Sequence, residues 1–383
     1  MFDKIDSKLI DNIKIQATSK SLCIVRFVDL KAMYDYIKLF NIENCECFES
    51  IKSVVLNLDK KELFDCAGLD SVAYISSISN VCAMVNLSKN IIGISKDFES
   101  GGDFSIAVID TGIYPHLDFM ISKKNKIIKF IDFVSGKNCI YDDNGHGTFV
   151  ASLLAGNGTI SGNKYIGIDK NISIIPIKAL DKNGESNTVT ILRAMQWVYD
   201  NMEKYNIKIV CMSFGSTVLE KNDPLILGAE ALWDKGVVVV SACGNSGPES
   251  STIKSPSASK KIISVGALDD HRVGDKYDKN NFEVAEFSSR GPIMGNYKPD
   301  LIVSGVDVVS ACHFGIYKKF YNKMSGTSVA TPIVAGVVSR LIKKYPNHTP
   351  DQIKKVLINN CHPITGDRNS EGFGWLDLRN IFD

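Results

Sequence analysis

The sequence predicts an α/β fold, a parallel sheet flanked by helices, preceded by a small α+β domain. From residue 105 onward, continuous apolar strands alternate with longer helical runs. Such strands are buried on both faces, which is typical of a parallel sheet that helices cover on both sides. Residues 21–84 differ, because short strand-like and helix-like runs alternate there. A chain of 383 residues is long enough to hold both parts.

The small domain is predicted to have the element order β-α-β-β-α-β. The assignment rests on the spacing of apolar residues and on runs of strand-forming residue types. This order is that of a small, ferredoxin-like α+β sandwich. We expect a strand at 22–28, a helix at 30–40, strands at 45–48 and 53–58, a helix at 60–66 and a strand at 72–78.

A linker is expected between the two domains. Residues 85–104 are polar and contain ESGGD at 99–103, a composition typical of loops. The expected segments are therefore 1–84 for the small domain, 85–104 for the linker and 105–383 for the large domain.

The large domain is predicted from buried-type strands that bracket helical runs. In a parallel sheet of this kind, chemistry gathers at the carboxyl ends of the strands. The expected strands are SIAVI at 105–109, IKIVCMSF at 207–214, VVVVSAC at 237–243 and IISVGA at 262–267.

Composition argues against several classes of function. With 44 basic and 43 acidic residues the net charge is +1, so nucleic acid and anionic membranes are not expected as partners. No apolar run reaches the roughly 20 residues of a membrane span. The N-terminal sequence lacks the apolar core of a signal peptide, and ten scattered cysteines show no metal-binding spacing. We therefore expect a cytoplasmic protein with free thiols.

A histidine between two glycines is the first candidate for chemistry. His146 lies in YDDNGHGTFVAS, residues 141–152, where a polar turn gives way to an apolar run. Two interpretations are open at this point. Either His146 simply begins a helix after an Asn-Gly turn, or it is a catalytic imidazole that needs partners elsewhere in the chain.

Three further positions offer partners of the required kinds. Asp110 follows a buried strand, where a carboxylate can orient an imidazole. Ser328 follows a Gly-Thr turn at the start of an apolar helix, near the positive end of the helix dipole. Asn245 lies in a Gly-rich turn, where its amide can donate to an oxyanion. Each residue alone is explained as a turn or cap, but with His146 they form a nucleophile, base and orienter set.

Five motifs together resemble the subtilisin-like serine proteases, the subtilases. The order Asp, His, Ser along the chain is the order in subtilisin. The resemblance extends from residue 105 to about 378 and is most like the intracellular bacterial branch. The motifs are AVIDTGI at 107–113, NGHGTFVAS at 144–152, SACGNSGP at 241–248, FSSRGP at 287–292 and MSGTSVATP at 324–332.

The resemblance implies a role for each candidate. His146 becomes the general base, Asp110 its orienting carboxylate and Ser328 the nucleophile. Asn245 becomes the oxyanion donor, together with the backbone N–H of Ser328. Residues 1–84 become a propeptide, a second partner besides the peptide or protein substrate. The substrate-binding residues that it implies are Gly184, Glu185, Ser186, Ser213, Gly215 and Lys254.

Several positions depart from the family. Phe149 stands where most members have a second histidine. Glu185 and Ser186 either narrow the cleft or select a basic residue, or else Glu185 is only a solvated loop charge. Asp118 aligns with a calcium ligand, but residues 155–167 do not match the calcium-binding loop of secreted members. The sequence therefore predicts no metal site and leaves calcium open as a cofactor.

Lys254 carries the sharpest expectation about specificity. Relatives have a small residue here, at the base of the pocket for the side chain that precedes the cleaved bond. A lysine ammonium in that pocket favours an acidic residue. The alternative is that the ammonium reaches solvent and leaves an ordinary apolar pocket.

The predicted function is a serine endopeptidase that removes its own N-terminal segment between residues 83 and 88. One alternative is a catalytically silent member of the family that acts as a sensor or binding protein. Silent members usually lack a triad residue, whereas Asp110, His146 and Ser328 are all present. A second alternative keeps the chemistry but narrows the target to leader peptides or to one protein.

Overall fold

The chain divides into two compact units, Met1–Val81 and Cys82–Asp383. Most of the expected linker and the expected cut between residues 83 and 88 lie outside the described residues. The computed structural model describes residues 4–5, 20–42, 45, 47–48, 52–77, 92, 102–121, 124–218, 223–273 and 276–382.

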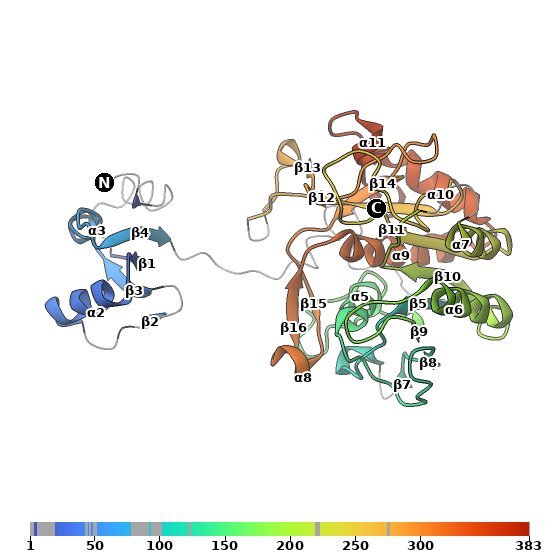
Figure 1. Ribbon diagram of the computed structural model, residues 1–383, viewed down its shortest axis with the longest axis horizontal. Helices are drawn as coiled ribbons and strands as arrows, with labels where there is room; N and C mark the ends of the chain where they lie inside the picture. Colours follow the sequence, from blue (N-terminus) through green and yellow to red (C-terminus); the bar gives the residue numbers. More distant parts are fainter. Residues whose placement is uncertain are drawn as a thin grey trace. The chain divides into compact units, whose positions relative to one another are not determined.

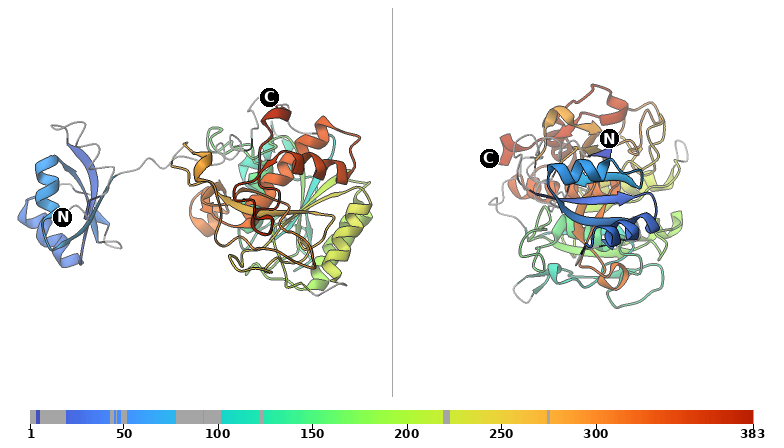
Figure 2. Two further views of the ribbon diagram at one scale, coloured as in Figure 1. Left: turned by 90° about the horizontal axis from the view of Figure 1, so that it is seen from above. Right: turned by 90° about the vertical axis from the view of Figure 1, so that its left-hand side faces the viewer.

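In the residues that the structure describes, the first unit is a four-stranded antiparallel sheet with two helices on one face (Figure 2). Its strand order is β2-β3-β1-β4. The elements follow the expected β-α-β-β-α-β order, and each boundary lies within two residues of the expected one. They are β1 (Ser21–Phe27), α2 (Leu30–Leu39), β2 (Cys47–Phe48), β3 (Ser53–Leu58), α3 (Lys60–Ala67) and β4 (Val72–Ser77).

The two helices in the described residues of this unit, α2 and α3, each begin at an aspartate cap. The Asp29 carboxylate accepts a hydrogen bond from the third residue of α2, Ala32. Asp59 and Glu62 form a capping box at the start of α3, which satisfies two backbone N–H groups that otherwise lack partners. The unit has a hydrophobic core of its own, which includes Val25, Phe27, Met33, Leu63 and Ile75.

The second unit is built on a ten-stranded sheet (Figure 1). Its order is β17-β18-β14-β12-β11-β10-β5-β9-β8, with β13 beside β12. All pairs from β8 to β18 along this order are parallel, and only β13 and β17 pair antiparallel. The predicted α/β class with a parallel sheet is confirmed. The strands are β5 (Ser105–Asp110), β8 (Ile131–Asp132), β9 (Ser173–Lys178), β10 (Ile207–Met212), β11 (Val238–Ala242), β12 (Ile263–Asp269), β13 (Glu283–Val284), β14 (Leu301–Ser304), β17 (Cys361–His362) and β18 (Trp375–Leu376).

Helices cover both faces of this sheet (Figure 1). Helices α5 and α9 pack against one face, and α6 and α7 pack against the other. No helix in the described ranges is long and apolar enough to cross a membrane. The longer helices are α5 (His146–Ala155), α6 (Thr188–Asn201), α7 (Pro224–Asp234), α9 (Thr327–Lys344) and α10 (Pro350–Asn359).

Shorter elements join these layers. Among them, β6 pairs with β7 and β15 pairs with β16, both antiparallel. The bounds are β6 (Met120–Ile121), β7 (Lys124–Asn125), β15 (Val308–Ala311), β16 (Tyr321–Met324), α8 (Phe314–Tyr317), α11 (Arg368–Glu371), α12 (Arg379–Phe382) and the 3₁₀ turns Leu117–Phe119 and Lys279–Asn281.

Helices α5 and α9 are central, buried helices. Every residue of α5 after His146 is buried, from Gly147 to Ala155. In α9 the run from Val329 to Leu341 is buried. A helix that is apolar on all sides belongs in a core, and the core fixes both helices against the sheet. Their N-terminal residues therefore have fixed positions, and these residues include His146 and Ser328.

Candidate active site

A cleft of about 690 Å³ brings together nine of the ten residues predicted for the site. Its walls come from loops that follow the carboxyl ends of β5, β9, β10 and β11, as expected for a parallel sheet. Lys254 is the predicted residue that does not line it. The nine that do are Asp110, His146, Gly184, Glu185, Ser186, Ser213, Gly215, Asn245 and Ser328.

Asp110 and His146 are in direct contact inside this cleft. His146 Nδ1 lies 2.8 Å from Asp110 Oδ1. The same carboxylate oxygen accepts the backbone N–H of Thr111 at 2.7 Å. The Asp110 side chain is buried, whereas the imidazole is 30 % exposed. The buried carboxylate therefore holds Nδ1 of the ring, while the rest of the imidazole is exposed to the cleft.

The charge of Asp110 sets the pKa of His146. Burial lowers the pKa of the imidazole, but the Asp110 carboxylate raises it by charge and by hydrogen bonding, and Asp142 adds to the rise. The net result is a pKa above the ordinary value of 6.5. The imidazole is therefore neutral, and able to accept a proton, only on the alkaline side of that value.

We expect the hydrolytic activity to fall on the acid side as His146 becomes protonated. Because its pKa is raised, kcat/KM is expected to reach half of its plateau at a pH above 6.5 and to rise toward alkaline pH. A pH profile of kcat/KM on a neutral peptide measures this midpoint. A midpoint below 6.5 contradicts the raised pKa, and a profile without an acid limb contradicts the assignment of His146 as the base.

Asp142 organises the loop that carries His146. Its side chain is buried, and Oδ1 accepts hydrogen bonds from Thr111 Oγ1, Asn144 N and Gly145 N. Oδ2 accepts from the backbone and the hydroxyl of Thr148. These bonds join the loop after β5 to the first turn of α5. Asp142 thus helps to hold the loop that places His146 next to Asp110.

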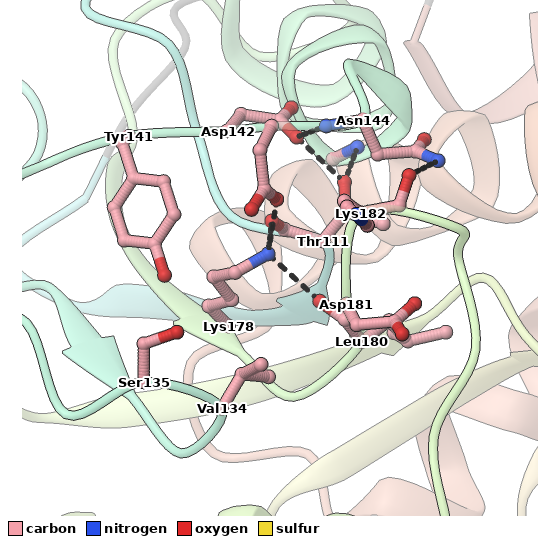
Figure 3. Close-up of polar contacts among 12 residues, drawn as sticks. Thr111, Val134, Ser135, Tyr141, Asp142, Asn144, Lys178, Leu180, Asp181 and Lys182 are labelled. Atoms are coloured by element: carbon pink, nitrogen blue, oxygen red, sulfur yellow. Dashed lines mark hydrogen bonds and ion pairs between the residues drawn. The ribbon is translucent and has the colours of Figure 1, made fainter.

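A buried lysine supports the same loops (Figure 3). Lys178 is the β9 partner of Asp110 in the sheet register, and its side chain is fully buried. Its ammonium donates to Thr111 O at 2.7 Å, Asp143 Oδ1 at 2.7 Å and Leu180 O at 2.9 Å. All three donors of the ammonium are therefore satisfied, and the buried charge has an acidic partner.

Gly147 is required where α5 meets the loop after β5. A β-carbon at this position would lie 2.2 Å from the carbonyl oxygen of Gly112 and 3.2 Å from Asp110 Oδ1. The first of these distances is shorter than any stable contact. The glycine therefore permits the close approach that brings His146 to Asp110.

The Asn245 side chain lies next to the first turn of α9, which carries Ser328. Asn245 Oδ1 accepts hydrogen bonds from the backbone N–H and the hydroxyl of Thr327, both at 2.9 Å. This fixes the amide so that its Nδ2 group is left for another acceptor. Gly326 leaves open the space next to both groups. A β-carbon at this position would lie 3.0 Å from Ser328 Oγ and 3.3 Å from Asn245 Nδ2.

The backbone N–H of Ser328 is a second donor at this point. Ser328 is the second residue of α9, and the first N–H groups of a helix have no partner within the helix. The positive end of the helix dipole adds to the attraction for negative charge. An oxygen anion next to Ser328 thus has two donors within reach, the Asn245 amide and this N–H.

The remaining predicted residues form the walls of the cleft. Glu185 is exposed, and its backbone is tied into a turn by hydrogen bonds with Asp181. The Ser186 hydroxyl donates to Ala179 O at 2.5 Å. On another wall, Ser213 is buried and Gly215 is exposed. Lining residues that the sequence did not single out include Asn144, Leu180, Asn183, Phe214, Ser216 and Leu225.

Lys254 lies beside this wall rather than on its surface. Its Cβ is 2.6 Å from where a β-carbon on Gly215 would be, and its Cγ is 2.5 Å from where one on Gly244 would be. The lysine stem therefore passes between two glycines. One of them lines the cleft, and the other directly precedes Asn245.

Two residues near the site are buried rather than reactive. Phe149 packs with Leu153, Val308 and Val329. Cys243 is fully buried, and burial raises the pKa of its thiol to about 12. A thiol with that pKa is not a thiolate near neutral pH, so Cys243 is not a competing nucleophile.

The surroundings of Asp118 do not fit a calcium ion. Asp118 is buried; its Oδ1 accepts the backbone N–H of Ile160 at 3.1 Å, and its Oδ2 accepts the Tyr321 hydroxyl at 2.7 Å. Both oxygens are thus engaged by protein donors, one of them from the loop at 155–167. Within the described ranges, no cluster of three or more His, Cys, Asp or Glu side chains is suited to a metal.

Comparison with known proteins shows the family. Residues 101–375 match the family described as Peptidase S8, the subtilase family. The chain is 37% identical to the serine protease AprX of Bacillus subtilis (strain 168) over 355 residues, which cover 88% of this chain and 75% of that protein. It is 31% identical to subtilisin DY of Bacillus licheniformis, with coverage of 73% and 90%.

Solved structures agree with these relatives. Sphericase superposes with a TM-score of 0.63 and 26% identity, covering 76% of this chain and 97% of that chain. The S41 psychrophilic protease superposes with a TM-score of 0.64 and 27% identity, with the same coverage of both chains. The predicted subtilisin-like fold is thereby confirmed. The chain belongs to the subtilase family and is a subtilisin-like serine peptidase.

Proposed function

We propose that this peptidase hydrolyses internal peptide bonds through a triad of Asp110, His146 and Ser328. The observation that carries the proposal is the 2.8 Å contact of Asp110 with His146 in the cleft that Ser328 also lines. The Asn245 amide, fixed by Thr327, completes the set.

In the first half of the reaction, Ser328 Oγ attacks the substrate carbonyl carbon while His146 Nε2 accepts the hydroxyl proton. Asp110 holds the proton on Nδ1 and stabilises the imidazolium that forms. The carbonyl oxygen becomes an anion that accepts hydrogen bonds from Asn245 Nδ2 and the Ser328 N–H. The C–N bond then breaks, and the imidazolium gives its proton to the leaving amine.

In the second half, water replaces the amine. His146 takes a proton from the water, whose oxygen attacks the ester carbon of the acylated Ser328. The same two donors hold the second oxyanion, and the ester bond to Oγ breaks as the imidazolium returns the proton. The enzyme is regenerated with a free serine hydroxyl.

Digestion of a peptide library tests this function. Purified protein is incubated with the library, and the products are identified by mass spectrometry. Internal cuts that appear with the wild type and disappear with His146→Ala support the proposal. Products cut only at chain ends, or none at all, contradict an endopeptidase.

Asn245→Ala is expected to lower kcat by about 10²–10³-fold with little change in KM. The alanine removes a donor whose bond strengthens only as the oxyanion forms, and the magnitude is that known for the oxyanion-hole asparagine of subtilisin, a member of this family. Steady-state kinetics with one peptide measures both constants. Ser246→Ala, the exposed neighbour outside the cleft lining, is the control; equal kcat for both variants contradicts the role of the amide.

We also propose that the first unit is a propeptide that the enzyme removes from itself. The unit is compact, has a core of its own and ends at Val81, close to the window between residues 83 and 88. A separately folded segment before a peptidase domain is suited to assist folding and then to be released.

Self-removal has a direct signature in the mass of the purified protein. Wild-type protein is expected to show a new N-terminus between residues 83 and 88, while Ser328→Ala stays full length. Intact mass and N-terminal sequencing measure this. If wild type and variant both remain full length and the wild type is fully active, the first unit is a permanent domain instead.

A further inference from the structure

Backbone hydrogen bonds fix Lys254 between two walls of the cleft. Lys254 N donates to Cys243 O at 2.9 Å. The next residue, Ser255, pairs with Ser216 in both directions, at 2.8 and 3.0 Å. One wall is thus residues 213–216, which line the cleft, and the other is residues 243–245, which end in the oxyanion donor.

The lysine stem occupies the gap between these walls. A β-carbon on Gly215 would come within 2.6 Å of Lys254 Cβ, and one on Gly244 within 2.5 Å of Lys254 Cγ. Carbon atoms do not approach that closely, so both glycines leave room for this particular side chain. The stem is held from both sides by backbone and has little freedom to leave.

The Lys254 ammonium has no acidic partner in the part of the chain that the structure describes. No carboxylate of those residues forms an ion pair with it, and the residue is half-buried. The fully buried lysines Lys178 and Lys298 differ, because each contacts an aspartate, Asp143 and Asp300. A half-buried cation without such a partner favours an anion that arrives from outside.

The substrate residue before the cleaved bond is expected to lie next to these two walls. Its carbonyl oxygen accepts the hydrogen bonds of Asn245 and the Ser328 N–H, because it is the carbonyl that Ser328 attacks. Its side chain branches one carbon away from that carbonyl. We therefore expect this side chain to lie near Asn245, next to the walls at 213–216 and 243–245 between which the Lys254 stem is held.

We propose that Lys254 makes this peptidase select a glutamate or aspartate immediately before the bond that it cleaves. The proposal rests on the endopeptidase function proposed above and names its substrate class. Lys254 is a specificity residue, since its charge meets the substrate side chain rather than the reacting atoms. Glu185, the exposed acid of the cleft lining, lies on a different segment, at 183–186.

Four peptides that differ only at this residue test the proposal. They carry Glu, Gln, Leu or Lys before the same bond, and kcat/KM is measured for each. Glu and Gln have the same shape, so their ratio isolates the charge. With the wild type, kcat/KM for Glu is expected to exceed that for Gln by about 10- to 100-fold, a size within the range for a close ion pair near a protein surface. Lys is expected to be the poorest.

Lys254→Met keeps a stem of similar length and removes the charge. For this variant, the ratio of kcat/KM for the Glu peptide to that for the Gln peptide is expected to fall to near 1, while kcat/KM for the Leu peptide rises. Lys260→Met, which removes an exposed lysine outside the cleft lining, is expected to keep the wild-type ratio. The wild-type ratio alone already tests the idea if the Lys254 variant does not fold.

Three results overturn the proposal, and they differ in whether the proposed peptidase function also falls. Rapid cleavage after Leu with equal rates for Glu and Gln shows that the ammonium lies in solvent; the peptidase function then stands. If none of the four peptides is cleaved but the peptide library is cut after Gly or Ala, the stem merely fills the pocket, and again the function stands. Failure to cleave any peptide, without acylation of Ser328, removes the proposed function together with its specificity.

Discussion

Ser328→Ala is expected to abolish turnover, with a loss of kcat of about 10⁶-fold, the size known for the same change in subtilisin. The change removes the one oxygen that attacks the substrate, while Asn245 and the backbone N–H still bind the carbonyl. KM is therefore expected to change little. The fold is expected to persist, because the backbone around Ser328 is set by Gly326 and by the bonds of Thr327 to Asn245.

The measurement is hydrolysis of one peptide, with far-ultraviolet circular dichroism to check the fold. Ser325→Ala is the matched control, since this exposed serine precedes the helix and donates nothing to the cleft. It is expected to keep near wild-type kcat. Substantial hydrolysis by a folded, pure Ser328→Ala protein contradicts the assignment of the nucleophile.

Asp110→Asn is expected to lower kcat by about 10⁴-fold, as loss of the orienting carboxylate does in serine proteases. The asparagine amide donates where the carboxylate accepted, so the proton of His146 moves to Nε2. An Nε2 that carries a proton cannot accept one from Ser328. The geometry is otherwise kept, because asparagine has the shape of aspartate.

The same variant is expected to shift the pH profile. The Asp110 charge is the main reason that the pKa of His146 is raised, so its removal moves the acid limb to lower pH. Asp307→Asn, which removes an exposed carboxylate paired with Lys323, should leave kcat and the acid limb unchanged. A variant with low kcat but an unmoved acid limb shows that the limb does not report His146.

The four candidate catalytic residues were predictable because each lies in a local signal. A strand end, an Asn-Gly turn and a Gly-rich helix start are short patterns, and parallel strands bring their ends to one edge. The structure accordingly places Asp110 and His146 in contact although 36 positions separate them. The small domain was predictable for a similar reason, since each of its strands and helices has its own local pattern of apolar residues.

The supporting residues were not predictable from such patterns. Asp142 and Lys178 act through partners on other segments, such as Thr111 and Leu180, and periodicity carries no information on pairing. The acidic pair before His146 and a lysine that ends an apolar strand were the available signals. Strand β9 gives a weak sequence signal, because Pro176 lies inside it and a proline argues against a central strand.

Covalent labelling of Ser328 tests the central claim most directly. A fluorophosphonate reacts with a serine only where a base accepts its proton and donors hold the developing charge, so it reports the whole arrangement at once. Wild-type protein is treated with the reagent and digested, and the modified peptide is located by tandem mass spectrometry. The account predicts one adduct, on Ser328, that is lost in His146→Ala and slowed in Asn245→Ala. An adduct on another serine, or labelling of Ser328 that does not depend on His146, contradicts it.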